Sequence, residues 1–500
     1  MALLRQFPGF VVLLLAFAGL MLVPAFHAAH LRNWPVARVF LDHALFLGLL
    51  GLILGYATMN RVPRRPTLYH LLTILLTFLL IPLALALPVQ ALVPGLGFGR
   101  AYFEMLSCLT TTGATLLDRV RLLPEPLHLW RALVGWMGGL IVLISAFAVL
   151  APLNLGGFEL LQAGSSHLEA RRGTTLPETS RRAIGFTRTI APLYALLTGG
   201  LALVLILAGD RPFIALCHAM GTLSTSGISP VGGLAGGRSG PVGEVAIALM
   251  LLTAVSPRIL GFGSGGLRLP SLADPQVQLM LITVLGVTLV LFLRSFLGAA
   301  GIDRQDNILA ALRALWGGLF TSLSFLTTTG YESRDWRTMQ LWSDLPAPGT
   351  ILMGMAVMGG GIATSAGGVK LLRLFALYRH GLREMDLLIH PSAVLGRGPG
   401  DRLLSTDAAR IAFIFLLLFL IGIALVMIAL AATGLDFQSS LAAAISGLTT
   451  TGPLLQMLGN GLHYADLTGP ALTILGAAMI VGRMEVLVIV ALFNPALWRR

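Results

Sequence analysis

Charged residues are scarce in this sequence: they make up 11% of the 500 residues, against roughly a quarter in a typical soluble domain. Cysteine occurs only twice, as Cys108 and Cys217, which excludes a multi-disulfide scaffold and a cysteine-rich zinc site. None of the ten histidines forms a pair at ligand spacing inside an apolar run, which disfavours a metal centre. The apolar runs also lack HExxH, GxSxG and paired carboxylates, so the sequence predicts neither an enzyme nor a covalent cofactor.

Apolar residues are abundant instead, at 56% of the chain with a mean hydropathy of +0.85. Ten runs reach the roughly 20 residues that a membrane-spanning helix needs. The first run is long for a signal-peptide core and another follows at once, so we expect a retained helix. The predicted fold class is therefore an all-α integral membrane protein. The ten runs lie near residues 8–29, 38–59, 68–90, 129–153, 188–209, 241–261, 276–298, 347–378, 410–433 and 469–493.

The formal net charge of +12 comes from basic residues that cluster in the segments between these runs. If ten runs alternate across the bilayer, the clusters at 60–67, 171–182 and 379–410 and the C-terminal Arg499 and Arg500 all fall on one side. The positive-inside rule assigns that side to the cytoplasm. We therefore expect both termini to be cytoplasmic, and topology explains the charge without a nucleic-acid partner.

Four short polar tags recur about a hundred residues apart, which indicates a repeated unit. They read LTTTG at 109–113, LSTSG at 223–227, and LTTTG at 326–330 and 448–452. Each tag ends an apolar stretch too short to cross a bilayer, as in a re-entrant helix, and full-length runs flank it. Irregular backbone at membrane depth is tolerated only inside protein or along a watery cavity. We therefore predict four membrane-pore-membrane repeats in a pseudo-fourfold arrangement, plus two N-terminal transmembrane helices.

Such a ring can act as an ion filter, because backbone carbonyls can replace the hydration shell of a monovalent cation and glycine accepts the unusual dihedral angles required. The hydroxyls of the third tag residues either add ligands or pin the loops. The alternative is that Thr and Gly are small packing residues; one tag would favour packing, whereas four equivalent tags favour the filter. The predicted ion-binding residues are Thr111, Thr112, Gly113, Thr225, Ser226, Gly227, Thr328, Thr329, Gly330, Thr450, Thr451 and Gly452.

The run 347–378 contains MGGGIATSAGGVKLLR, and each glycine lowers helix propensity by about 1 kcal/mol relative to alanine. We expect Gly359 to Gly368 to unwind into a loop below the filter. The nearby lysine does not make this a nucleotide-binding P-loop, because Val369 precedes Lys370 and Leu371 follows it.

The last run carries IVGRMEVLVIV, which places Arg483 and Glu485 in apolar surroundings. An ionisable residue at such depth costs at least about 2.5–3.5 kcal/mol on insertion scales and usually faces a polar interior. Residues two apart on a helix do not face one another, so a structural ion pair would need another partner for Glu485.

These features resemble the Trk/Ktr/HKT superfamily of potassium transporters over nearly the whole chain, and look most like its bacterial TrkH/TrkG branch, which also adds two N-terminal spans. The resemblance implies that the filter glycines are Gly113, Gly227, Gly330 and Gly452. In the family a serine at the first of these positions accompanies sodium permeation, so Gly113 implies that the permeating ion is potassium. The residues flanking Gly227 and Gly452 differ from the sequence that is most common in the family at these positions. The resemblance also implies that Arg483 is a pore-facing electrostatic barrier. It implies an intramembrane gate at Gly359, Gly360, Gly361, Ser365, Gly367, Gly368 and Lys370.

The same resemblance implies a homodimer among the lipids of the bacterial inner membrane, with a cytoplasmic nucleotide-binding regulatory subunit similar to TrkA or KtrA. Potassium would be the transported ion. The expected division of the chain is residues 1–62 for the two extra helices, 63–160 for repeat 1, 161–265 for repeat 2, 266–385 for repeat 3 with the broken gate helix, and 386–500 for repeat 4.

Two further readings concern transport type and the outer mouth. An alternating-access symporter coupling potassium to sodium or protons would show inverted repeats and paired broken helices, whereas these repeats share one orientation and one run is conspicuously broken. Asp118, Glu332 and Asp335 follow two of the tags and either enrich cations there or are ordinary exposed acids. Asp436 is placed as the N-cap of the fourth short helix.

Overall fold

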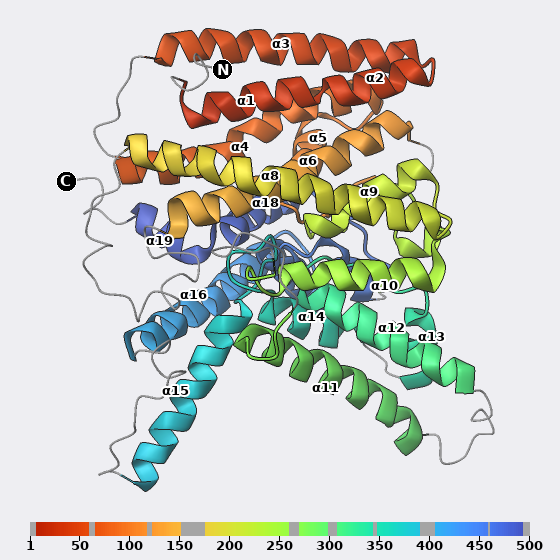
Figure 1. The fold of residues 1–500 in the computed structure, drawn as a ribbon, viewed down its shortest axis with the longest axis vertical. Helices are drawn as coiled ribbons and strands as arrows, with labels where there is room; N and C mark the ends of the chain where they lie inside the picture. The colour runs from red at the N-terminus through yellow and green to blue at the C-terminus, as the bar shows by residue number, and fades with distance from the viewer. Residues whose placement is uncertain are drawn as a thin grey trace.

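The computed structural model describes residues 7–59, 66–117, 123–151, 176–259, 270–298, 308–343, 348–390, 406–458 and 461–493. These residues form helices joined by turns and contain no strand (Figure 1). The all-α fold predicted from the sequence is therefore confirmed. Asp118 and the arginines at 171, 172, 499 and 500 lie outside the described residues, as do residues 260–269 at and after the end of the sixth run.

Eight helices in the described ranges are long and apolar enough to cross a membrane. Their outward faces carry exposed leucines and isoleucines, for example Leu45 and Ile282, as expected of surfaces in contact with lipid acyl chains. The first helix is interrupted at Met21 but counts as one span of 22 residues. The elements that contain these spans are α1 (Gly9–Leu20) with α2 (Leu22–His30), α3 (Trp34–Thr58), α4 (Pro66–Leu92), α6 (Glu125–Ser145) with the π-helical turn η3 (Ala146–Leu150), α8 (Leu176–Leu207), α11 (Pro275–Gly298), α12 (Ile308–Leu326) and α16 (Thr406–Ala431).

Each tag follows directly on the C-terminal end of a helix that is buried towards that end. These four helices are the pore helices of repeats 1 to 4: α5 (Phe98–Leu109), α9 (Pro212–Leu223), α12 and α17 (Phe437–Thr449). Three of these helices have 12 or 13 residues, as predicted, but α12 has 19 and meets the length of a span. At the start of α17, the side chain of Asp436 accepts a hydrogen bond from the backbone N–H of Ser439, which confirms the predicted N-cap.

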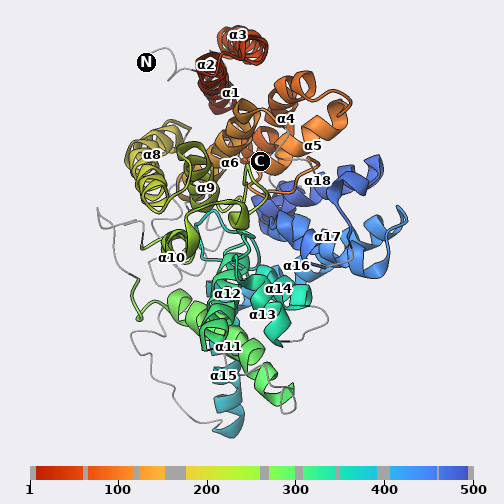
Figure 2. The same cartoon turned by 90° about the vertical axis from the view of Figure 1, so that its right-hand side faces the viewer.

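The four repeats close into a ring. The helix after each tag packs against the pore helix of the next repeat: α6 on α9, α10 (Gly240–Leu251) on α12, α14 (Pro348–Met358) on α17, and α18 (Gly469–Met484) back on α5. With many of the helices viewed close to end-on, the repeats surround a common centre (Figure 2), and α15 (Leu371–Ile389) projects away from it (Figures 1 and 2). The chain thus forms the predicted pseudo-fourfold arrangement.

The N-terminal helices α1, α2 and α3 stand at one edge of this ring (Figure 1). They pack on α4 and α6 through a cluster that includes Phe17, Phe40 and Trp130. They therefore add to repeat 1 without contributing a tag.

Three of the ten predicted spans are not continuous long helices. The run 241–261 becomes α10 with a 3-10 turn, η6 (Leu252–Ala254), and the run 347–378 becomes α14 and α15 separated by a loop. The run 469–493 becomes α18 and α19 (Val486–Phe493), separated at Glu485, whose φ is +62°. The prediction of a single conspicuously broken span is therefore wrong. Apolar composition alone does not show that the last helix is interrupted at the charged residue Glu485. The remaining short elements are η5 (Leu234–Gly236), α13 (Trp336–Ser343), η8 (Gly452–Leu458) and η9 (Tyr464–Asp466).

Candidate functional site: the ring of four tags and the loop beneath it

The four tags share one backbone conformation. The middle residue of each polar triplet is left-handed, with φ of +56° at Thr111, +52° at Thr225, +56° at Thr328 and +55° at Thr450. Left-handed non-glycine residues are uncommon, and threonine is β-branched, so four equivalent instances indicate a backbone held by its surroundings.

Hydrogen bonds of one kind hold each tag to its pore helix. The N–H of the third triplet residue donates to the carbonyl five residues earlier, as in helix C-terminal motifs that end in a left-handed residue. In the first three tags the N–H of the glycine also approaches that carbonyl, at 3.3–3.4 Å. The bonds are Thr112 to Ser107, Ser226 to Gly221, Thr329 to Ser324 and Thr451 to Ser446, each 2.9 Å.

The fourth tag differs from the others at its glycine. Gly113, Gly227 and Gly330 have φ of +74°, +62° and +78°, whereas Gly452 lies outside the left-handed region and begins η8. The N–H of Gly452 donates to the carbonyl of Thr112 in the adjacent first tag at 2.6 Å. The departure expected near Gly452 from its flanking sequence therefore has a structural counterpart, whereas Gly227 keeps the common conformation.

The hydroxyls of the third triplet residues point back to their own repeat. In every tag the first hydroxyl bonds to the carbonyl four residues earlier and lies within hydrogen-bond distance of the third hydroxyl. The distances are 2.9 Å for Thr110 to Thr112, 2.9 Å for Ser224 to Ser226, 3.2 Å for Thr327 to Thr329 and 3.1 Å for Thr449 to Thr451. Of the two roles considered for these hydroxyls, the geometry favours pinning the loops.

Consecutive tags touch at their glycines. A Cβ on Gly113 would come within 2.0 Å of the carbonyl oxygen of Ser226, and one on Gly227 within 2.2 Å of that of Thr329. A Cβ on Gly452 would lie 2.2 Å from the backbone nitrogen of Ala114 in repeat 1. A Cβ on Gly330 would lie 2.8 Å from the ring of Pro453, the residue after the fourth tag. The tags therefore form a closed ring with space for glycine but not for a side chain.

Residues 359–370 form a buried, non-helical loop on one side of this ring. Left-handed φ values occur at Gly359, Ala363, Gly368 and Lys370. The loop is tied to repeat 2 by the N–H of Gly361, which donates to the carbonyl of Ala254 at 2.9 Å. The predicted unwinding between Gly359 and Gly368 is thus confirmed, and hydrogen bonds hold the unwound segment in one place.

The loop meets the ring at Gly367. The N–H of Gly367 donates to the hydroxyl of Thr328 at 2.8 Å, and a Cβ there would lie 2.1 Å from the carbonyl oxygen of Thr449. Ser365 reaches the carbonyl of Leu223 at 3.5 Å. The loop therefore touches the pore helices or tags of repeats 2, 3 and 4.

Arg483 connects the loop with the remaining repeat. Its guanidinium donates to the hydroxyl of Thr111 at 2.6 Å, to the carbonyl of Thr110 at 3.3 Å and to the carbonyl of Ser365 at 2.6 Å. The side chain is buried between the first tag and the loop.

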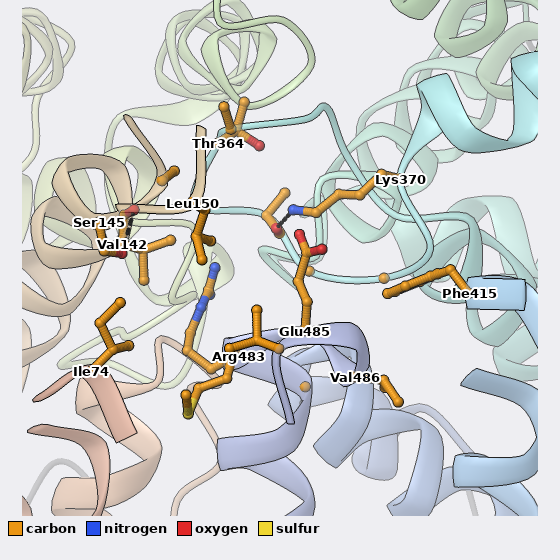
Figure 3. Close-up of a pocket in the computed structure, with 18 of the residues that line it drawn as sticks. Ile74, Val142, Ser145, Leu150, Thr364, Lys370, Phe415, Arg483, Glu485 and Val486 are labelled. Atoms are coloured by element: carbon orange, nitrogen blue, oxygen red, sulfur yellow. Dashed lines mark hydrogen bonds between the residues drawn. The ribbon is translucent and has the colours of Figure 1, made fainter. Parts of the chain in front are cut away.

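A charge cluster continues from Arg483. Glu485 forms an ion pair with Arg373 at 2.7 Å, and that guanidinium stacks on the ring of Phe415 at 3.8 Å. Lys370, the single lysine of the chain, donates to the carbonyl of Ala366. Arg483 and Glu485 project into one pocket from the end of α18, and Lys370 reaches it from the opposite wall (Figure 3). Sequence reasoning missed Arg373, because an arginine at the start of an amphipathic helix gives no signal of burial.

The outer limbs of the filter loops, meaning the segments that follow the tag glycines, are held by buried polar groups that sequence reasoning also missed. Glu104 pairs with Arg131 at 2.8 Å, and Glu244 accepts hydrogen bonds from Ser333 and the backbone of Arg334. Their only sequence signal is a lone carboxylate in an otherwise apolar stretch. The described residues contain no group of three or more His, Cys, Asp or Glu that could hold a metal ion.

Comparison with known proteins gives a consistent answer. The family model "TrkH: Cation transport protein" matches residues 267–500. The "Trk system potassium uptake protein TrkH" of Salmonella typhimurium is 29% identical over 498 residues, covering 98% of each chain. "Trk system potassium uptake protein TrkI" of Halomonas elongata is 29% identical over 468 residues, covering 91% of each. The crystal structure of the potassium transporter TrkH from Vibrio parahaemolyticus superposes with a TM-score of 0.80 at 24% identity over 100% of both chains, which supports the fold.

The helical ring, with its eight apolar helices of spanning length, thus defines a multi-pass membrane protein, and the comparisons relate it to cation transport proteins. The resemblance drawn from the tags is confirmed: residues 267–500 match the TrkH cation transport model, and nearly the whole chain is similar to Trk system proteins.

Proposed function

We propose that this protein conducts potassium ions across the membrane through a selectivity filter built from its four tags. The observation that carries the proposal is the closed ring of four left-handed threonines, each followed two residues later by a glycine, which turns backbone oxygens such as that of Ser226 towards the neighbouring repeat. Carbonyl oxygens grouped in this way can replace the hydration shell of a potassium ion. The names of its relatives as potassium uptake proteins support the choice of ion.

The loop 359–370 serves as the gate in this proposal, with Gly359, Gly360, Gly361, Ser365, Gly367, Gly368 and Lys370 as its working residues. It bonds to Thr328 in the ring and is backed by Arg483, so in this conformation it obstructs the inner end of the filter. Opening requires the loop to exchange those bonds for others, and its glycines permit the necessary dihedral changes. Arg483 adds a fixed positive charge that raises the electrostatic barrier to a passing cation.

A coupled symporter remains the second candidate, because more than one helix is broken. The interruptions between α14 and α15 and between α18 and α19 lie against each other through the Arg373–Glu485 pair, which gives two discontinuous helices at one site. The repeats nevertheless follow one another around the ring in the same sense, which favours a channel-like pore over inverted-repeat transport.

The proposal extends to assembly and topology. We infer a homodimer in the bacterial inner membrane, with both termini in the cytoplasm and a nucleotide-binding regulatory subunit on the same side. The projecting helix α15, which exposes Arg379 and Arg383 beside Glu384 and Asp386, offers a surface of mixed charge to such a partner.

Two measurements test the function. Expression should restore growth of potassium-uptake-deficient cells in low potassium, and failure despite membrane insertion and a compatible regulatory subunit would contradict it. The reversal potential in bilayers under potassium and sodium gradients then separates the two candidates. A potential that follows the potassium gradient alone supports passive flow, and one that shifts with a proton or sodium gradient supports coupled transport.

A further inference from the structure

Each pore helix carries, nine residues before its tag glycine, a side chain at an equivalent position. These residues are Glu104 on α5, His218 on α9, Thr321 on α12 and Ala443 on α17. All four are buried, and three of them are polar. A polar side chain inside a membrane protein is expected to have a partner, because an unsatisfied group there is costly.

In the first repeat that partner is the chain just beyond the filter. The carboxylate of Glu104 accepts a hydrogen bond from the backbone N–H of Leu116 at 2.9 Å and one from the hydroxyl of Thr115 at 3.0 Å. Arg131 on α6 holds the carboxylate from behind at 2.8 Å. Glu104 thus links its pore helix to residues two and three places past Gly113.

The next two repeats make the same connection with different chemistry. His218 Nε2 lies 2.9 Å from the hydroxyl of Ser229, two residues past Gly227. The hydroxyl of Thr321 accepts from the N–H of Ser333 at 3.2 Å, three residues past Gly330. Three unlike side chains therefore make one bridge at one position of the repeat.

The fourth repeat lacks this bridge, because Ala443 has no polar group. There the hydroxyl of Tyr464 donates to the carbonyl of Gly452 at 2.6 Å and also contacts the hydroxyl of Ser446 at 2.7 Å. Tyr464, at the start of η9, thus anchors the fourth tag in place of a residue on the pore helix. The glycine of this tag, Gly452, is the one that departs from the common conformation.

We propose that Glu104, His218 and Thr321 are positioning residues that fix the outer limbs of the filter loops and thereby set the discrimination between potassium and sodium. This inference rests on the proposed filter. The bonds to the carbonyls of Ser107, Gly221 and Ser324 hold each loop from within its own pore helix on the approach to the glycine. The bridges hold the segment after the glycine, so each loop is clamped on both sides of its carbonyl ligands. Selectivity depends on how firmly those ligands are placed.

The test uses neighbouring residues of α12. Thr321→Val keeps the shape of the side chain and removes its hydroxyl. Ser322→Ala is the matched control, because Ser322 is buried and its hydroxyl finds no hydrogen-bond partner among the described residues. Amide hydrogen exchange of the peptide containing Ser333 in the full-length protein should accelerate about tenfold in Thr321→Val and stay unchanged in Ser322→Ala. The potassium-to-sodium permeability ratio should fall about two- to tenfold only in the former.

Glu104 allows a second test that separates the bridge from the ion pair. Glu104→Gln retains an acceptor for Leu116 but loses the charge that Arg131 needs. The exchanged pair Glu104→Arg with Arg131→Glu retains both charges but removes the acceptor for Leu116. We expect the exchanged pair to show the larger loss of selectivity and faster exchange of the peptide Ala114–Leu117. Full recovery of both readouts in the exchanged pair would overturn the bridge.

Failure of the inference and failure of the proposed function give different results. If the parent protein selects potassium but Thr321→Val matches Ser322→Ala in exchange and permeability, the bridges do not position the filter while the function stands. If the parent protein shows no potassium selectivity, the proposed function fails. The hydrogen-exchange comparison then still decides whether the bridges hold the loops, and equal rates overturn them.

Discussion

The guanidinium of Arg483 donates a 2.6 Å hydrogen bond to the hydroxyl of Thr111, a residue 372 positions away in the chain. The same guanidinium bonds to Ser365 in the loop 359–370. One buried cation therefore joins the first tag, the broken third repeat and the break in the fourth. Any movement of the loop away from the ring must change the environment of this charge.

Neutralising Arg483 should increase cation flux. Arg483→Gln removes the positive charge and weakens the bonds to Thr111 and Ser365, and hydrogen bonds to charged groups contribute about 1.5–3 kcal/mol each. We expect rubidium uptake into proteoliposomes to rise by about tenfold. Arg188→Gln removes the same charge from an exposed part of α8 and is the matched control. Equal uptake by the two variants would contradict a barrier at Arg483.

The first tag should not tolerate a side chain. In Gly113→Ser the new Cβ would lie 2.0 Å from the carbonyl oxygen of Ser226, and φ of +74° is strained for serine. The ring must widen or distort, so we expect sodium permeability to rise relative to potassium, with a shift in reversal potential of tens of millivolts.

Gly99→Ser is the control for that experiment, because Gly99 lies on the same pore helix and a Cβ there meets nothing within 4 Å. An unchanged reversal potential in Gly113→Ser would remove the support for a filter at this ring.

Stiffening the loop should alter gating. In Gly368→Ala the added Cβ would lie 2.6 Å from the Cα of Gly359, and φ of +78° disfavours alanine, so the observed loop conformation is destabilised by about 1–3 kcal/mol. We expect a higher open probability in single-channel recordings. Gly354→Ala on the neighbouring helix α14 adds the same methyl group into open space and should leave gating unchanged. Identical gating in both variants would show that the loop has a structural role and does not gate the pore.

Acidification of the outer side should reduce uptake through Glu332. Burial raises the pKa of Glu332, which follows the third tag two residues beyond Gly330. A raised carboxyl pKa means that the negative charge is present above that value and is lost as the external pH falls through it. Local cation enrichment then declines.

Glu332→Gln should flatten this acid limb of the uptake profile at constant membrane potential. Asp335→Asn, which neutralises the next acid along the chain, is the comparison. If Glu332→Gln leaves the acid limb in place, Glu332 does not attract the ion.

Much of the fold followed from local sequence. Apolar runs of sufficient length, short pore helices and the repeated tags predict the helical ring, because desolvating backbone groups in lipid allows few other solutions. The glycines between 359 and 368 likewise predict an interrupted helix. These inferences depend only on composition and spacing, which the sequence carries directly.

What the tertiary structure decided is which residues meet. Charges at 373 and 485 pair at 2.7 Å across two breaks, and the helix breaks at Glu485 although its apolar flanks favour continuity. The bridges from Glu104, His218 and Thr321 show no common residue type, so they become visible only when the loops are folded back on their pore helices. Composition and period determine secondary structure and membrane depth, whereas contacts between distant segments depend on closure of the ring, which no local pattern encodes.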